Sequence, residues 1–150
     1  MEIRRYTAAQ IEDVLEFERA IRAEEDFWGW DIDEAYVKAV RESFDDPKFA
    51  NAVSLLAYDA GRVVGRIDAA LICSRFDGKV QAYLDWICVV KSFRHKGTAQ
   101  ALLGSLRALL HDAYGVTTLI ALMARNDEAQ RFYRSIENAS IHDEAIWITC

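Results

Sequence analysis

The chain has 150 residues, of which 52% are hydrophobic and 28% charged, with a single proline. This composition is typical of one globular domain over residues 1–150 that needs neither disulfides nor metal, and it excludes a disordered chain. The formal net charge of −6 disfavours nucleic acid as a partner, because binding to the phosphate backbone needs a basic face. No apolar run is long enough to cross a membrane and no signal peptide is recognisable, so we expect a cytoplasmic protein.

The first third of the chain predicts a short strand and two helices. Residues 3–6 are the candidate strand, and Thr7 is a suitable N-cap for the helix that follows. A second helix runs through residues 35–44 and ends near Pro47. The apolar side of the first helix consists of Ile11, Val14, Leu15, Phe17 and Ile21.

The middle of the chain predicts three consecutive antiparallel strands. Residues 53–58 and 63–72 flank the turn Asp59-Ala60-Gly61, which is a hairpin signal. Asp77-Gly78 is a second hairpin signal and leads into an apolar strand over residues 82–90. A long helix then begins near residues 97–99, and after it come a strand at 117–123, a helix at 127–135 and a final strand at 141–149.

The resulting order, β-α-α-β-β-β-α-β-α-β, predicts the α/β class, with a mixed, largely antiparallel sheet and helices on its faces. The strand-helix-strand unit over residues 83–123 would have parallel strands joined by a right-handed crossover. That geometry leaves space for a ligand beside the N-terminus of the central helix.

A short basic loop joins the apolar strand to the central helix. The first N–H groups of a helix have no intrahelical partner and carry the positive end of the helix dipole, so such a junction binds phosphate. Gly97 and Ala99 lack bulk and let an anion approach the main chain, while Arg94, His95 and Lys96 add positive charge. The loop therefore predicts a diphosphate site.

A second pattern follows the strand after the central helix. Asn126 is a suitable N-cap, and Ala129, Phe132 and Tyr133 share one side of the helix that it opens. The two patterns, Arg94-x-x-Gly97-x-Ala99 and Asn126-x-x-Ala129-x-x-Phe132-Tyr133, resemble the two coenzyme-A motifs of the GNAT superfamily of N-acyltransferases. The resemblance in element order covers nearly the whole chain.

The resemblance implies an enzyme that uses acetyl-CoA to acetylate a primary amine, and it implies a site for each part of the coenzyme. The main chain of the basic loop would bind the pyrophosphate, a strand edge would pair with the pantetheine arm, and the second motif would approach the thiol. These positions are Arg94, His95, Lys96, Gly97, Thr98 and Ala99 for the loop; Ile87, Cys88 and Val89 for the edge; and Asn126, Ala129, Phe132 and Tyr133 for the motif.

Two residues are candidates for the proton transfers. The Tyr133 hydroxyl is a suitable donor to the departing thiolate. Asp85 lies on an otherwise apolar strand, where it either acts as the base that deprotonates or orients the amine, or forms a structural ion pair. Cys88 is not expected to carry the acetyl group, because direct attack by the amine needs no thiol. Further base candidates are Glu24, Glu25, Asp26, Asp31, Asp143 and Glu144.

An aromatic and acidic loop is the candidate acceptor site. Its members Phe27, Trp28, Trp30 and Asp31 suit a cation, although the rings could instead cover the core between the first two helices. Together with the acidic net charge, the loop favours a small cationic amine that is aminoglycoside-like or polyamine-like. The alternatives are a protein N-terminal or lysine acetyltransferase and a non-catalytic acyl-CoA-binding module. No metal is implied, and a homodimer is compatible with the sequence.

The sequence departs from the family pattern near its end. The family commonly continues Tyr-x-x-x-Gly-Phe, whereas Tyr133 is followed here by Arg134-Ser135-Ile136-Glu137-Asn138. Asn138 is the residue that could adopt the left-handed conformation in place of the missing glycine.

Overall fold

The computed structural model describes residues 1–25, 29–142 and 145–150. The chain forms two compact units, Met1–Ile120 and Ala121–Cys150. The single domain over residues 1–150 stays a prediction. Among the described residues, no helix combines the length and apolar character needed to cross a membrane.

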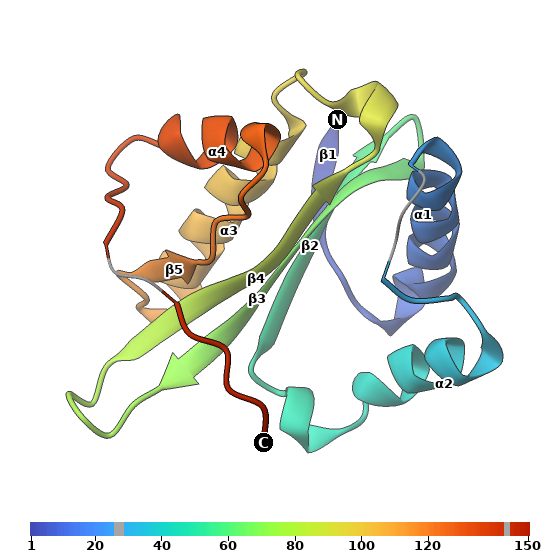
Figure 1. Ribbon diagram of the computed structural model, residues 1–150. Helices are drawn as coiled ribbons and strands as arrows, with labels where there is room; N and C mark the ends of the chain where they lie inside the picture. Colours follow the sequence, from blue (N-terminus) through green and yellow to red (C-terminus); the bar gives the residue numbers. More distant parts are fainter. Residues whose placement is uncertain (26–28, 143–144) are drawn as a thin grey trace. The chain divides into compact units, whose positions relative to one another are not determined.

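A sheet forms the centre of the first unit, as Figure 1 shows. Its strand order follows the chain. β1 pairs antiparallel with β2, β2 with β3 and β3 with β4, and the last two pairings are those that the hairpin signals predict. Beyond β4 lies β5, which is shorter than the strand predicted at residues 117–123. The α/β class and the mixed sheet are confirmed. The strands are β1 (Glu2–Arg5), β2 (Ala52–Asp59), β3 (Arg62–Cys73), β4 (Val80–Val89) and β5 (Leu119–Ala121).

A bulge interrupts β4 in its middle. Asp68 of β3 pairs with Trp86 and Ala69 pairs with Leu84, so Asp85 has no partner on β3. A bulge bends its strand and changes the direction of the extra side chain. Asp85 is consequently exposed although its neighbours along the strand are buried or half-buried.

Two helices follow β1. The first helical residues form a 3-10 turn (Ala8–Gln10), in which the Gln10 side chain accepts a hydrogen bond from the Thr7 N–H at 2.9 Å. The helix α1 (Ile11–Glu24) then packs on β3 and buries the apolar side chains predicted for it. The next helix, α2 (Glu34–Ser43), is capped by Asp33 and contains no fully buried residue. It is followed by a second 3-10 turn (Pro47–Phe49).

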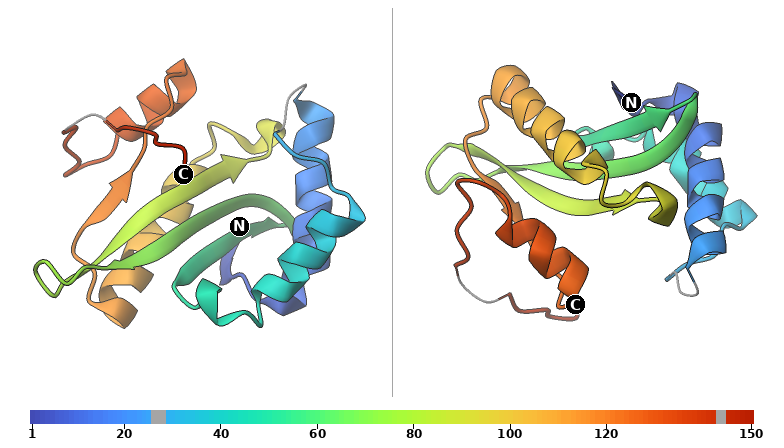
Figure 2. Two further views of the ribbon diagram at one scale, coloured as in Figure 1. Left: turned by 60° about the horizontal axis from the view of Figure 1, so that its bottom comes forward. Right: turned by 90° about the horizontal axis from the view of Figure 1, so that it is seen from above.

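The opposite face of the sheet is covered by α3 (Thr98–Tyr114), which packs against β2, β3 and β4 (Figure 2). The packing is close because Gly65 of β3 has no side chain. A Cβ atom there would lie 3.0 Å from Leu102 Cδ1 and 3.2 Å from Thr98 Cγ2. Gly65 therefore determines how near the N-terminal turns of α3 come to the sheet.

The second unit contains α4 (Asp127–Arg134), which Asn126 caps as predicted by accepting the Ala129 N–H at 2.8 Å. Asn138 adopts the left-handed conformation, with φ of 61°. The final strand predicted over residues 141–149 is wrong, because residues 141–142 and 145–150 contain no strand. Residues of high β-propensity form a strand only where a neighbouring strand takes their backbone hydrogen bonds.

We expect Gly65→Ala to destabilise the protein by about 1–3 kcal/mol, because the added methyl group overpacks the contact between β3 and α3. The free energy of unfolding in urea measures the effect. Gly104→Ala is the matched control, since Gly104 lies on α3 with nothing within 4 Å of the added carbon. The control should stabilise the helix by roughly 0.5–1 kcal/mol. Equal effects of the two substitutions would contradict the packing role of Gly65.

Candidate active site

The loop between β4 and α3 ends at an open helix N-terminus. After a 3-10 turn (Lys91–Phe93), Gly97 adopts a left-handed φ of 83° and α3 begins at Thr98. The first intrahelical hydrogen bond of α3 runs from the Ala101 N–H to the Gly97 carbonyl at 2.9 Å. The N–H groups of Thr98, Ala99 and Gln100 precede it and have no acceptor inside the helix. Such an end fits an anionic ligand.

The charged side chains of this loop differ in what they contact. The Arg94 Nε donates to the Val89 carbonyl at 3.0 Å, and its Nη2 lies 2.5 Å from Glu25 Oε1. Glu25 therefore compensates the positive charge of Arg94. This differs from the expectation from the sequence, in which Arg94 adds positive charge around the anion. Lys96 and His95 are exposed, and the Lys96 Nζ donates to the Ser92 carbonyl at 2.9 Å. The loop consequently offers an anion its main chain and the exposed ammonium group of Lys96.

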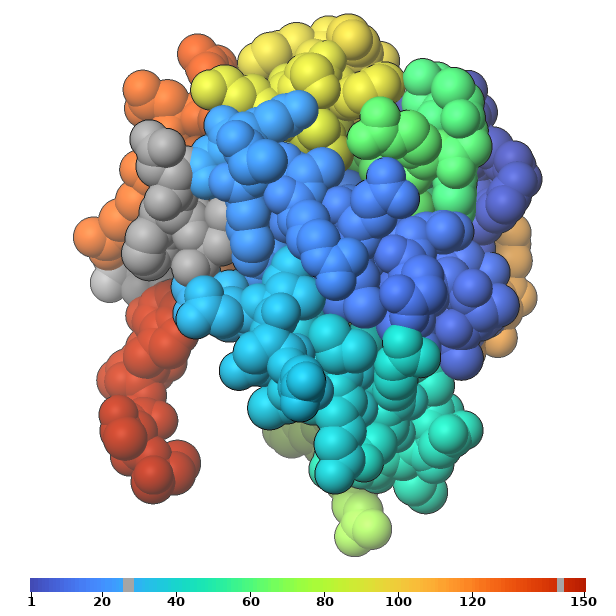
Figure 3. All heavy atoms as spheres, turned by 90° about the vertical axis from the view of Figure 1, so that its right-hand side faces the viewer, coloured from blue at the N-terminus to red at the C-terminus, as the bar shows by residue number. Residues whose placement is uncertain are grey.

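The end of α1 holds this loop. The Glu24 carboxylate accepts from both the backbone N–H and the hydroxyl of Ser92, each at 3.1 Å. In Figure 3 the yellow loop before α3 lies against the end of α1. Glu24 and Glu25, which were base candidates from the sequence, therefore act here as partners of the loop.

The edge of β4 that faces β5 is paired only near its beginning. The Ala82 N–H donates to the Thr118 carbonyl at 3.1 Å, and β5 extends for only three residues beyond this point. In the described part of the chain, the stretch Ile87, Cys88 and Val89 therefore has no strand beside it on that edge. Backbone groups at a free edge can pair with an extended ligand. Burial raises the pKa of the Cys88 thiol to about 12, which agrees with a structural role for this cysteine.

Asp85 lies at the bulge beside Trp86, and no hydrogen bond or ion pair reaches it from the described residues. The ring of Trp30, one of the sequence-predicted acceptor positions, lies 6.3 Å from that of Trp86 and 6.3 Å from that of Tyr36. Trp30 is 42% exposed and Asp31 is exposed. Phe27, Trp28 and Asp26 lie outside the described residues, as do Asp143 and Glu144.

Two arginines lie over these indole rings. The Arg22 guanidinium is 5.3 Å from the centre of the Trp30 ring. Arg66 lies between the rings of Trp86 and Tyr6, at 5.6 Å and 5.0 Å. Cations at these distances are attracted to the ring faces. Trp86 thus packs against the core, whereas Trp30 presents a partly exposed aromatic surface.

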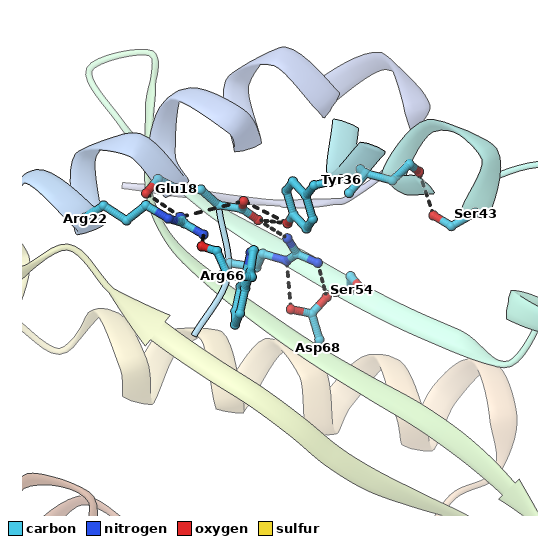
Figure 4. Close-up of polar contacts among 9 residues, drawn as sticks. Glu18, Arg22, Tyr36, Ser43, Ser54, Arg66 and Asp68 are labelled. Carbon is cyan, nitrogen blue, oxygen red and sulfur yellow. Dashed lines mark hydrogen bonds and ion pairs between the residues drawn. The ribbon is translucent and has the colours of Figure 1, made fainter. Parts of the chain in front are cut away.

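A buried carboxylate joins the arginines, as Figure 4 shows. Glu18 is 1% exposed and accepts from the Tyr36 hydroxyl at 2.7 and 2.8 Å and from Arg66 Nη1 at 3.1 Å. Arg66 also pairs with Asp68 at 2.7 Å, and Asp68 accepts from the Ser54 hydroxyl at 2.6 Å. Burial and the hydrogen bond to Glu18 raise the pKa of Tyr36 to about 12, so this hydroxyl keeps its proton.

Sequence reasoning missed this cluster, although a signal was present. Glu18 follows Val14 by four positions and precedes Ile21 by three, which places a carboxylate on the apolar side of α1. A charge in that position requires a buried partner. Its partners come from α2 and β3, and no local pattern identifies them.

The second unit holds the remaining sequence-predicted residues. Ala129, Phe132 and Tyr133 are half-buried on α4, and the rings of Phe132 and Tyr133 meet edge to face at 5.2 Å. Asn126 is occupied as the cap of the helix. Within residues 1–25, 29–142 and 145–150, no three His, Cys, Asp or Glu side chains are grouped as a metal site would require.

Comparisons with known proteins agree with this arrangement. A family model described as an acetyltransferase (GNAT) domain matches residues 50–136. No curated protein sequence is similar enough to count as a match.

Solved structures share the fold at low identity. An aminoglycoside acetyltransferase from an uncultured soil metagenomic sample, in complex with sisomicin, is 15% identical over 99% of this chain and 95% of its own, with a TM-score of 0.82. AAC(6')-Iy in complex with a CoA bisubstrate analogue is 16% identical over 99% and 97%, with a TM-score of 0.75. A ribosomal-protein-alanine N-acetyltransferase from Brucella melitensis biovar Abortus 2308 is 18% identical over 99% and 100%, with a TM-score of 0.74.

We expect Gly97→Ala to weaken binding of coenzyme A about tenfold, because a hydrogen bond to a charged group contributes roughly 1.5–3 kcal/mol. Its φ of 83° strains any side chain, so the loop must shift away from the open end of α3. Titration calorimetry measures the dissociation constant. Gly78→Ala is the matched control, with a φ of 69° and open space around it in the β3–β4 turn. An equal loss of affinity in both variants would contradict the role of this loop.

Proposed function

The chain belongs to the GNAT acetyltransferase family, and from that premise we propose that it acetylates the primary amine of a small cationic molecule. The observation that carries this proposal is Asp85, an exposed carboxylate without a partner in the described chain, at a bulge beside Trp86. A carboxylate attracts an ammonium group through its charge, and the face of an indole ring attracts a cation as well. Aminoglycosides and polyamines have this chemistry.

Acetyl-CoA supplies the acetyl thioester. The N–H groups of Thr98 and Ala99 fit its diphosphate, because they lack acceptors in α3 and the glycine before them leaves space. The free edge at Ile87, Cys88 and Val89 fits the amide groups of its pantetheine arm. Asn126, Ala129 and Phe132 are the coenzyme-binding residues that the second motif implies.

The chemical step needs one proton acceptor and one proton donor. Asp85 takes a proton from the ammonium form of the acceptor or orients the amine, whose nitrogen then attacks the acetyl carbonyl carbon. As the carbon–sulfur bond breaks, the Tyr133 hydroxyl donates a proton to the leaving thiolate. The nitrogen then loses its second proton to solvent as the amide forms, and Tyr133 regains a proton from solvent. A backbone N–H at the free edge of β4, at Cys88 or Val89, holds the oxyanion.

A turnover screen tests the function. Purified protein is incubated with acetyl-CoA and a panel of aminoglycosides, polyamines and peptides with free amino termini or lysines, and the release of free thiol is measured. Turnover of small polycations supports the proposal, and turnover of peptides alone would favour a protein acetyltransferase. Binding of acetyl-CoA without turnover of any amine would favour a non-catalytic module. The cytoplasmic location and a homodimer stay predictions.

We expect Tyr133→Phe to lower kcat by roughly 10²- to 10⁴-fold, because the general acid is lost. The Kd of coenzyme A should stay nearly unchanged, since the ring remains. Steady-state kinetics and calorimetry measure the two quantities. Tyr114→Phe, at the far end of α3, is the control and should leave kcat unchanged. A large loss of coenzyme affinity with normal kcat would be incompatible with the role assigned to Tyr133.

We expect Asp85→Asn to lower kcat/KM for the amine by about 10²-fold or more, because the acceptor loses both an attracting charge and a base. The loss should shrink as pH rises and the free amine becomes abundant. Asp45→Asn is a control on an exposed carboxylate outside the site. A normal kcat/KM at neutral pH would exclude Asp85 from the reaction.

A further inference from the structure

We infer that Glu18 and Tyr36 are positioning residues for the amine acceptor: they hold the Trp30 ring beside the ring of Trp86, the neighbour of Asp85 in sequence, and thereby set the affinity for the acceptor. The inference rests on the proposed function in one respect, namely that the acceptor binds at Asp85. The contacts that carry it lie within the unit Met1–Ile120.

Tyr36 connects the buried carboxylate to the partly exposed indole. Its hydroxyl donates to both oxygens of Glu18, at 2.7 and 2.8 Å. Its ring lies 6.3 Å from the Trp30 ring, with an angle of 37° between the planes. A shift of Tyr36 therefore moves the surface against which Trp30 rests.

Glu18 is itself held by the sheet and by its own helix. Arg66 of β3 donates to its carboxylate at 3.1 Å. Arg22, one turn later on α1, donates to the Glu18 carbonyl at 2.7 Å and to the Trp30 carbonyl at 3.2 Å. The Arg22 guanidinium also lies over the Trp30 ring, 5.3 Å from its centre. Arg22 therefore contacts both the backbone and the side chain of Trp30.

Core stability alone does not account for this arrangement. Trp30 is 42% exposed, so the contacts orient an indole that the core does not bury. No residue of α2 is fully buried, and the hydroxyl of Tyr36 attaches this helix to a charge that is costly to bury. A polar anchor of this kind has a directional geometry, which suits the orientation of a ligand-binding ring.

The first test is Tyr36→Phe, which removes the hydroxyl and keeps the ring. We expect KM for the amine to rise by several-fold to about 100-fold, because interaction energies between contacting residues correspond to changes of this size. The kcat and the Kd of coenzyme A should stay nearly unchanged. Tyr58→Phe is the matched control, because it removes a similar bond, from a buried tyrosine to Asp13 on α1 at 2.8 Å, away from Trp30. Equal KM effects in the two variants would overturn the inference.

A double-mutant cycle tests whether Tyr36 acts through Trp30. Trp30→Phe combined with Tyr36→Phe should raise KM no more than Trp30→Phe alone. Additive effects would mean that Tyr36 acts on the acceptor independently, and would overturn the inference. If Tyr36→Phe does not fold, Glu18→Gln replaces it in the same cycle.

A spectroscopic measurement separates this inference from the proposed function. Two indoles in contact give an exciton couplet in circular dichroism, which Trp30→Phe should abolish. The couplet should weaken in Tyr36→Phe and persist in Tyr58→Phe; an unchanged couplet in Tyr36→Phe would overturn the positioning role. If no amine is acetylated, the proposed function fails, while the circular dichroism still decides whether Tyr36 positions Trp30.

Discussion

The N–H groups at the start of α3 need a hydrogen-bond acceptor that the helix cannot supply. The rest of the proposed coenzyme site in this unit is arranged around this requirement. Gly65 lets α3 approach the sheet, the left-handed Gly97 directs the chain into the helix, and Glu24 and Glu25 hold the loop in front of it. An anion that binds there completes the backbone hydrogen bonding of the fold.

One helix, α1, contributes to both halves of the candidate site. Its last residue, Glu24, contacts the loop before α3, and Glu18 in its middle anchors the aromatic cluster at the proposed acceptor site. A movement of α1 relative to the sheet would therefore affect both halves. The buried pair between Glu18 and Arg66 resists such a movement, since separating two buried charges is costly.

Much of the fold follows from patterns that are local in the chain. The apolar spacing of α1 and α3, the turns at Gly61 and Gly78 and the cap at Asn126 all act over a few residues, and all are present as predicted. Residues 141–149 also have the composition of a strand, but pairing depends on a neighbour that is distant in sequence. Arg94 is a similar case, because Glu25, which compensates its charge, follows α1 and is distant in sequence.

The sequence by itself determined the order of elements as far as α4, the loop that fits a diphosphate and the family, because spacing and turn chemistry are properties of short segments. Only the tertiary structure decided that Asp85 lies at a bulge, that Trp30 meets Trp86 and that Glu18 is buried among arginines. These features arise where α1, α2, β3 and β4 come together. Register and side-chain pairing between such elements depend on the packing of the whole unit, and no short stretch of sequence contains that information.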